Sequence, residues 1–253
     1  MLTSGFTHAP ISRILVFYLV AAALAASITD SQYLLYIQID KHLWVHRQFW
    51  RGLTWQASYV NSTEVLFAAM AFYQLRVIER LWGSRKFASF LLTTLPWTTL
   101  LPPILLALVL RPLTFNHANY LPAGPTPILF ALLAQYHAAI PQTYRLRLAT
   151  SASASSPSSS TAAQTSSPIS SSTSTRAFTI SNKIYTYLLP LQLSLSALPG
   201  SALAALVGWC VGYAWRNEML PGATWRVPRW VVGEKEGSAV GGTREFEGLR
   251  RRL

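Results

Sequence analysis

Six blocks of apolar residues constrain this chain more than any other feature of its sequence. The blocks are residues 14–28, 59–78, 87–110, 121–140, 184–198 and 201–215. A transmembrane helix needs about 20 mostly apolar residues, and the blocks reach or approach that length. Charged residues make up only 12% of the chain, whereas soluble domains carry about 25%. The sequence therefore predicts an all-α membrane protein in which six helices span the bilayer.

The basic residues are distributed unequally between the two sides that these spans define. With the N-terminus in the cytosol, seventeen of the 21 Lys and Arg residues are cytosolic, and only Lys41, Arg47, Arg51 and Arg111 lie on the other side. Cytosolic loops of membrane proteins are enriched in Lys and Arg, so we predict that both termini are cytosolic. The net charge of +12 does not indicate a nucleic-acid partner, because the basic residues lie between and after apolar blocks instead of forming one face of a soluble module.

Residues 31–57 combine aromatic rings with cations, including Trp50 and Arg51. Because this mixture is typical of the headgroup zone, we expect the segment to lie in the membrane interface. Glu64 and Arg76 are near the two ends of the second block, where we expect them to reach polar headgroups. Residues 61–63 match a glycosylation acceptor, although a polar cluster that starts a helix is the simpler interpretation.

Two segments have compositions that do not form a packed core. Residues 149–178 are rich in Ser, Thr and Ala, and we predict that they are a disordered cytosolic insertion. Residues 217–253 are rich in Gly and charged residues, and we predict a cytosolic tail. Residues 1–216 are therefore the predicted transmembrane domain, with the insertion between its fourth and fifth spans.

The loop after the second block has the pattern Glu79-Arg80-x-x-Gly83-Ser84-x-x-Phe87. A short basic loop with a Gly-Ser turn is an ordinary connection between spans. Together with the six spans and the aromatic segment, however, the pattern resembles the rhomboid-like superfamily. The longer run 76–92 resembles rhomboid pseudoproteases that carry a C-terminal ubiquitin-associated domain, a family with a subunit of the fungal Golgi Dsc ubiquitin-ligase complex and its animal counterpart in the endoplasmic reticulum. The resemblance covers roughly residues 5–216 and implies a six-helix rhomboid-like transmembrane bundle.

The resemblance makes the absence of a catalytic serine testable in the sequence. A rhomboid protease carries its nucleophile in Gly-x-Ser-Gly at the start of the fourth span. When this chain is aligned on residues 130–132, the corresponding residues are Gly124, Pro125, Thr126 and Pro127. Thr126 stands in the place of the serine, and Pro127 removes a backbone N–H from the same turn.

The position of the catalytic histidine is also occupied by another residue. The usual pattern in the sixth span is His-x-x-Gly-x-x-x-Gly, and anchoring it on Gly208 and Gly212 puts Ala205 where the histidine belongs. An alanine cannot accept the proton that a serine nucleophile must lose. The five histidines all lie outside the sixth span: His8, His42, His46, His117 and His137. We therefore expect a pseudoprotease without catalytic residues.

Small residues recur every four positions in the sixth span, at Gly200, Ala204, Gly208 and Gly212. A stripe of small residues lets the backbones of two membrane helices approach closely. The stripe is either the surface on which the sixth span packs against the fourth or a surface for a partner protein, and the sequence leaves both open.

The resemblance implies a non-catalytic membrane scaffold in a ubiquitin-ligase or degradation complex of the endoplasmic reticulum or Golgi. The implied partners are ligase subunits, membrane protein substrates and a UBX-domain adaptor that recruits an AAA-ATPase. One departure from the family is that residues 217–253 lack the apolar periodicity of a ubiquitin-associated domain, so ubiquitin binding does not carry over. An intramembrane serine protease is the alternative function, and a transporter is a weaker one because no intramembrane charge pair or repeat is evident. We expect no cofactor or metal, since there is a single cysteine and no third ligand beside His42 and His46.

Overall fold

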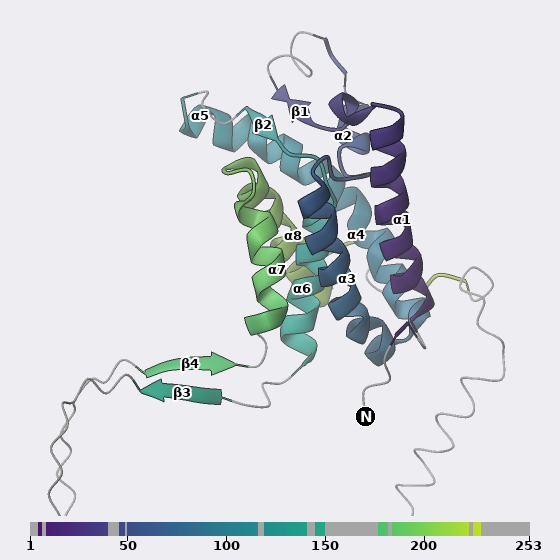
Figure 1. The fold of residues 1–253 in the computed structure, drawn as a ribbon, viewed down its shortest axis with the longest axis vertical. Helices are drawn as coiled ribbons and strands as arrows, with labels where there is room; N and C mark the ends of the chain where they lie inside the picture. The colour runs from purple at the N-terminus through teal and green to yellow at the C-terminus, as the bar shows by residue number, and fades with distance from the viewer. Residues whose placement is uncertain are drawn as a thin grey trace, which may run out of the picture. The chain divides into compact units, whose positions relative to one another are not determined.

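The computed structural model describes residues 5–6, 9–39, 46–48, 50–115, 119–140, 145–149, 177–181, 184–222 and 225–228. These residues are mostly helical (Figure 1). The helices are α1 (Pro10–Ile28), a 3-10 turn η1 (Gln32–Leu34), α2 (Arg51–Thr54), α3 (Ser62–Trp82), α4 (Ser84–Leu105), the π-helical η3 (Leu106–Leu110), α5 (Arg111–Leu113), α6 (Thr126–Ala139), α7 (Ile184–Leu195) and α8 (Gly200–Arg216). The strands are β1 (Ile37–Gln38), β2 (Tyr120–Leu121), β3 (Arg145–Ala149) and β4 (Ala177–Ser181).

Each predicted apolar block overlaps one of the longer helices, but the boundaries differ. The first helix begins at Pro10, because a proline in the first turn loses no helical hydrogen bond. Helix α4 continues through η3 and α5, and together they cover residues 84–113. By length and composition, α1 with 19 residues and this continuous helix with 30 residues are candidate membrane spans within the described part of the chain. Six spans remain a prediction.

The start of the fourth block was predicted wrongly. Instead of a helix from residue 121, the chain forms β2, which pairs with β1 in antiparallel register, with Ile37 opposite Leu121. Helix α6 begins only at Thr126, because Pro122 and Pro125 disfavour helical conformation in the residues before them. Helix α6 is therefore 14 residues long and α7 is 12, or about 21 and 18 Å at 1.5 Å per residue, which is shorter than a hydrocarbon core of about 30 Å.

The chain divides into two compact units, Met1–Ile140 with Thr186–Leu253, and Pro141–Tyr185. Within the second unit, β3 pairs antiparallel with β4, from Arg145 opposite Ser181 to Ala149 opposite Ala177. These strands and the β1–β2 pair correct the all-α expectation. Strand β3 includes the first residue of the predicted disordered insertion, and β4 includes its last two residues. The rest of that insertion lies outside the described residues.

The core of the first unit is centred on α6, which packs against α3, α4 and α8, while α1 packs against α3 and α4 (Figure 1). Large side chains fill the space between these helices, among them Phe72, Phe87, Phe90, Leu132 and Trp215. A second, smaller cluster lies beneath the β1–β2 pair and includes Trp55, Leu106 and Ala204. The core thus joins helices that are far apart in the sequence.

The segment 31–57 packs on the helices more extensively than we expected. Trp55 is fully buried, and its indole N–H donates to the backbone oxygen of Thr99 at 3.1 Å. Arg51 is also buried, whereas Trp50 stays 46% exposed. An indole N–H and a guanidinium can be buried once their donors have hydrogen-bond partners. Only part of the segment is therefore available to the membrane interface.

Two other polar residues, Glu64 and Arg76, have neighbours within the fold. Glu64 is buried and accepts a hydrogen bond from the Asn61 side chain at 3.2 Å, instead of reaching headgroups. The Arg76 guanidinium lies 3.6 Å from the ring centroid of Tyr73. Helix α3 begins at Ser62, directly after Asn61, so the polar cluster at residues 61–63 starts a helix, as predicted.

The first part of the predicted tail is attached to α4. Val227 is 1% exposed, its N–H donates to the Ser89 hydroxyl at 2.9 Å, and its carbonyl accepts from Arg85 Nε at 2.7 Å. Residues 225–228 of the predicted tail are therefore held against α4. Sequence composition missed this contact because two backbone hydrogen bonds and one valine are enough to hold it.

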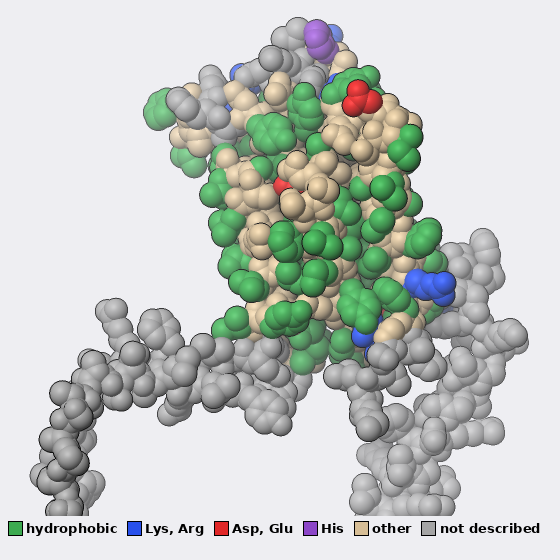
Figure 2. All heavy atoms as spheres, viewed as in Figure 1, with side chains coloured by type: hydrophobic (Ala, Val, Ile, Leu, Met, Phe, Trp, Pro, Cys, Tyr) green, Lys and Arg blue, Asp and Glu red, His purple; other side chains and the backbone are tan. Residues whose placement is uncertain are grey.

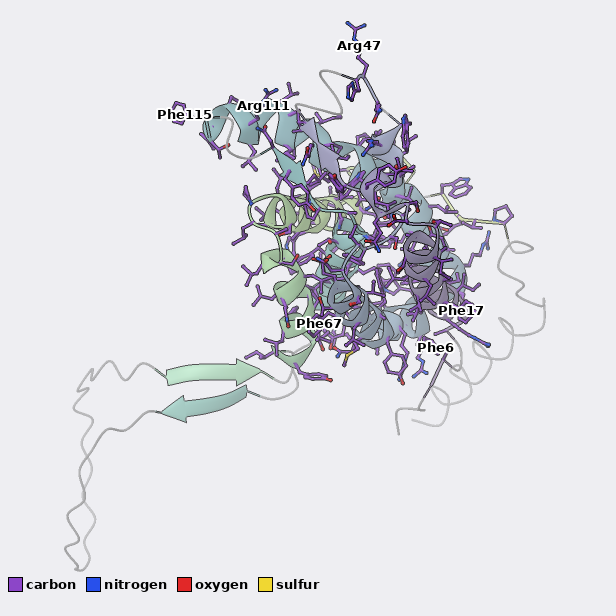
Figure 3. All side chains as sticks on the ribbon, turned by 45° about the horizontal axis from the view of Figure 1, so that its top comes forward. Phe6, Phe17, Arg47, Phe67, Arg111 and Phe115 are labelled. Carbon is purple, nitrogen blue, oxygen red and sulfur yellow. The ribbon has the colours of Figure 1, made fainter. Side chains whose placement is uncertain are left out.

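Hydrophobic side chains cover the middle of the face that α1, α3 and α7 present, and the described Lys and Arg side chains lie towards its ends (Figure 2). Phe17 of α1 and Phe115 after α5 are 77% and 88% exposed, and both point away from the neighbouring helices (Figure 3). An exposed apolar surface of this extent is typical of contact with lipid or with other membrane helices.

Candidate functional site

A fully buried carboxylate lies in the last turn of α3, at the start of the predicted loop to α4. Glu79 accepts hydrogen bonds from the backbone N–H groups of Ile11 and Ser12, at 2.9 and 2.7 Å, and from the Ser84 hydroxyl at 2.8 Å. The first N–H groups of a helix have no partner within the helix, and the helix N-terminus favours negative charge. Glu79 therefore caps α1 from a neighbouring helix and holds it against the α3–α4 turn.

The other residues of this loop support the same connection. Gly83 has a φ of +82° and separates α3 from α4, a conformation that glycine adopts without strain. The Arg80 guanidinium donates to the backbone oxygen of Gly5 at 2.6 Å, which adds a second contact to the segment before α1. Phe87 is 2% exposed in the core. The loop motif is thus a structural junction of three helices.

A second junction is formed around Arg51, which is 6% exposed. Its guanidinium donates to the backbone oxygens of Tyr33 and Tyr36, at 2.9 and 3.3 Å, and to the Gln48 side chain at 2.7 Å. It also lies 5.5 Å from the ring centroid of Trp50. Arg51 thereby fixes the segment before α2 from the inside, whereas the sequence pattern predicted an exposed cation at the headgroups.

Thr126, in the place of the protease nucleophile, is the first residue of α6 and is buried. Its hydroxyl lies 3.2 Å from the Tyr59 hydroxyl. Gly124 has a φ of +140°, and a Cβ at this position would overlap the Tyr59 ring. A phenol loses its proton only near pH 10, so the Tyr59 side chain is not a general base for Thr126 at neutral pH. Nothing in the sequence links Tyr59 to Thr126, because the two residues belong to separate segments of the chain.

Ala205, in the place of the catalytic histidine, is 5% exposed in α8. It lines a cavity of about 230 Å³ together with Phe130 and Ser194. His137 lies at the far end of α6 from Thr126, and its Nδ1 is 2.8 Å from the Tyr187 hydroxyl. Among these residues the structure shows no imidazole positioned beside the Thr126 hydroxyl.

The stripe of small residues on α8 faces the α6 segment. A Cβ on Gly208 would lie 2.7 Å from Pro127 Cα, and one on Gly212 would lie 2.9 Å from Ala131 Cα. A Cβ on Gly200 would meet the β2 backbone at Tyr120, and Ala204 is 1% exposed. The backbones of α6 and α8 are therefore in direct contact, and the Gln135 amide donates across the seam to the Gly212 carbonyl. Of the two alternatives for the stripe, the one with core packing agrees with this geometry.

An apolar cavity of about 440 Å³ lies between α1 and α4. Its polar residues include Gln56 and Thr99, whose side chains are hydrogen-bonded to each other. Nothing in the sequence indicates this cavity, because its walls come from five separate places: α1, α3, α4, the end of α2 and the start of α6. No group of three or more His, Cys, Asp or Glu side chains suited to a metal occurs within the described ranges, and Cys210 is an exposed free thiol.

Comparison with known proteins gives these junctions a family context. The family model described as "Eukaryotic integral membrane protein (DUF1751)" matches residues 11–217, well over half of the chain. The chain belongs to this family. The matched range includes the Glu79 junction, the Arg51 junction and the α6–α8 seam of this chain.

Two kinds of curated relative are similar to this DUF1751 protein. The DSC E3 ubiquitin ligase complex subunit 2 of Schizosaccharomyces pombe is 29% identical over 218 residues, which are 86% of this chain and 51% of that protein. The ubiquitin-associated domain-containing protein 2 of Mus musculus is 30% identical over 141 residues, which are 55% of this chain and 41% of that protein. The chain spans about half the length of these curated relatives or less. No solved structure gives a significant match.

These relatives confirm the family that the loop motif and the run 76–92 suggested. The fungal and animal proteins named in the resemblance are the ones that the chain matches. The protein is therefore an integral membrane protein related to a ubiquitin-ligase complex subunit.

Proposed function

We propose that this chain is a non-catalytic membrane subunit of a ubiquitin-ligase complex and acts as a scaffold in protein degradation. The observation that carries the proposal is the similarity over 86% of the chain to a protein named as a subunit of such a complex. Ligase subunits, a UBX-domain adaptor and membrane protein substrates are the proposed partners. The proposed location is the membrane of the endoplasmic reticulum or Golgi.

In this proposal the first unit forms a six-helix rhomboid-like bundle within a domain of residues 1–216. The six helices are α1, α3, the continuous helix of residues 84–113, α6, α7 and α8. The order of these helices supports the proposal, as does the close packing of α8 on α6 through Gly208 and Gly212. Both termini and the Ser/Thr-rich insertion are cytosolic, and the tail of residues 217–253 lies beyond the domain.

The absence of catalysis is supported by the residues at the two positions of the protease dyad. Thr126 is next to a phenol, and Ala205 has no proton acceptor. A serine or threonine hydroxyl needs an adjacent base to become a nucleophile. The bundle then serves to hold partners in the membrane, with the Glu79 and Arg51 junctions keeping its helices in place.

The function is tested by purifying the tagged full chain from its own cells in a mild detergent and identifying what co-purifies. The expected result is enrichment of a membrane ubiquitin ligase and a UBX-domain protein over a control purification with an unrelated multi-pass membrane protein. Recovery of the chain without any ligase subunit, under conditions that preserve other membrane complexes, would contradict the proposed function.

The topology is tested separately with an epitope tag at residue 160. Because seventeen of the 21 basic residues fall on one side, the tag should be digested by protease added to sealed vesicles without detergent. A tag that is protected until detergent is added would refute the six-span arrangement with a cytosolic insertion.

A further inference from the structure

A polar pocket of about 530 Å³ lies where the first turn of α4, the last turn of α6 and the end of α8 meet. Its charged lining comprises Lys86, Arg216, Arg226 and one carboxylate, Glu218. The pocket is separate from the apolar cavity between α1 and α4 and from the positions of the protease dyad. None of the functions discussed above makes use of it.

Two deeply buried polar groups line this pocket and lack hydrogen-bond partners. Gln135 is 1% exposed, and its Nε2 donates to the Gly212 carbonyl. Because a carbonyl only accepts, this bond fixes the amide orientation and leaves Gln135 Oε1 as an unpaired acceptor. Trp215 is 7% exposed, and its indole N–H is an unpaired buried donor. Since buried polar groups are nearly always hydrogen-bonded, the pair indicates a ligand that can both donate and accept.

The indole is held in place by other aromatic rings. Trp215 stacks on Trp82 at a centroid distance of 5.5 Å, and Phe90 meets it edge-on at 4.9 Å. Lys86 Nζ lies 4.8 Å from the Trp82 ring centroid, so this ammonium is positioned at the rim of the same aromatic group. Trp215 is thus part of a rigid wall of the pocket, which lowers the entropic cost of binding.

The charged side chains of the pocket indicate the second feature of the ligand, which is a phosphate group. Three cations and one carboxylate give the lining a net positive charge, and Arg and Lys are the residues that bind phosphate in proteins. Arg216 by itself is explained by its place at the C-terminus of α8, where cations are stabilised. That explanation does not extend to Lys86 in the first turn of α4, nor to the unpaired groups of Gln135 and Trp215.

We propose that this pocket binds a phosphate ester of a polyol, and specifically the headgroup of an inositol-type anionic phospholipid. The phosphate lies between Lys86 and Arg216, a headgroup hydroxyl donates to Gln135 Oε1, and a headgroup oxygen accepts from the Trp215 indole N–H. Basic pockets between transmembrane helices on the cytosolic side are a known form of lipid-headgroup site, and this end of the chain is cytosolic in the proposed topology. The lipid site does not depend on which protein partners the chain has.

The site is tested by titrating the full chain, purified in a neutral detergent at physiological salt, with short-chain phospholipids and measuring binding by native mass spectrometry. Phosphatidylinositol should bind more tightly than phosphatidylcholine by at least about ten-fold, the equivalent of one strong polar contact. Phosphatidic acid, which has the phosphate but no polyol, should bind with intermediate affinity. Equal affinity for the three lipids would overturn the proposal.

Variants with a matched control locate the binding. The double variant Lys86→Gln and Arg216→Gln should weaken phosphatidylinositol binding roughly thirty-fold, at about five-fold for each basic residue near a membrane surface. Arg13→Gln removes an exposed cation of α1 outside this pocket and should change the affinity less than about two-fold. An equal loss in Arg13→Gln would mean that binding follows overall charge, which would refute the site.

The role of the polyol is tested with Gln135→Met, which keeps the length of the side chain and removes the acceptor. It should abolish the preference for phosphatidylinositol over phosphatidic acid while leaving phosphatidic acid binding. If this buried change prevents folding, the double variant of Lys86 and Arg216 still decides the question. Inositol 1-phosphate distinguishes the source of the ligand: displacement only at concentrations far above those of the lipid supports a membrane ligand, whereas binding as tight as the lipid would overturn the assignment to a lipid.

Discussion

Substituting Gly208 by leucine should destabilise the protein more than a similar change elsewhere on α8. A Cβ at this position would lie 2.7 Å from Pro127 Cα and 2.8 Å from Pro127 C, whereas ordinary contacts begin at about 3.5 Å. The obstructing atoms are α6 backbone, which cannot rotate away as a side chain would. Helix α8 must therefore move away from α6, and the seam that contains Gly212 and Gln135 opens with it.

The magnitude follows from the geometry of the seam. Overpacking of a tight core typically costs 1–3 kcal/mol, and a clash with backbone belongs at the upper end, about 3 kcal/mol. For a chain of this size, each kcal/mol lowers the melting temperature by about 2–4 °C, so we expect Gly208→Leu to lower it by roughly 6–12 °C.

The assay is thermal unfolding of the purified protein in detergent, together with its steady-state level in cells. Cys210→Leu enlarges an exposed residue two positions away on the same helix, and this matched control should stay within about 1 °C of the parent. Gly208→Leu with the melting temperature and cellular level of the parent would refute the packing of α8 on α6. A normal melting temperature with lost partner proteins would instead assign the stripe to a partner surface.

Three further predictions concern the two junctions and the dyad position. Glu79→Ala should destabilise the protein by about 3 kcal/mol or more, because it leaves two buried N–H groups and a hydroxyl without their acceptor, and Glu79→Gln should be milder; equal melting temperatures for Glu79→Ala and the parent would contradict the capping role. Arg51→Met should increase hydrogen exchange of the peptide covering residues 31–39 with little change in α6, and unchanged exchange there would show that the guanidinium contacts do not hold this segment. Thr126→Ala should leave assembly and stability within about 0.5–1.5 kcal/mol of the parent, and neither protein should cleave a rhomboid substrate; a cleavage product lost on this change would establish a protease.

The sequence by itself determined where the helices of this chain form and which family it belongs to. Apolar blocks interrupted by short polar loops specify helices in the same places as α1, α3, α4, α6, α7 and α8, because helix formation depends on local composition and the spacing of apolar residues. The regular spacing from Gly200 to Gly212 also indicated a close helix contact, since four residues bring side chains to the same face of a helix.

The helix boundaries were less accessible from composition. The pairing of β1 with β2 joins residues more than 80 positions apart. Local sequence patterns do not indicate contacts between residues so far apart. The fourth helix was therefore predicted to begin at residue 121 instead of Thr126.

Only the tertiary structure decided the roles of the polar residues. Glu79 meets the N-terminus of α1 across 68 residues of sequence, Arg51 is buried against carbonyls of an earlier segment, and Gln135 and Trp215 come together at one pocket from α6 and α8. In the sequence Glu79 and Arg51 have the pattern of solvated or headgroup-facing side chains, whereas Gln135 and Trp215 lie in two separate apolar blocks. Burial and hydrogen-bond partners are properties of the surroundings that distant segments supply, and for that reason they appear only when the helices are packed.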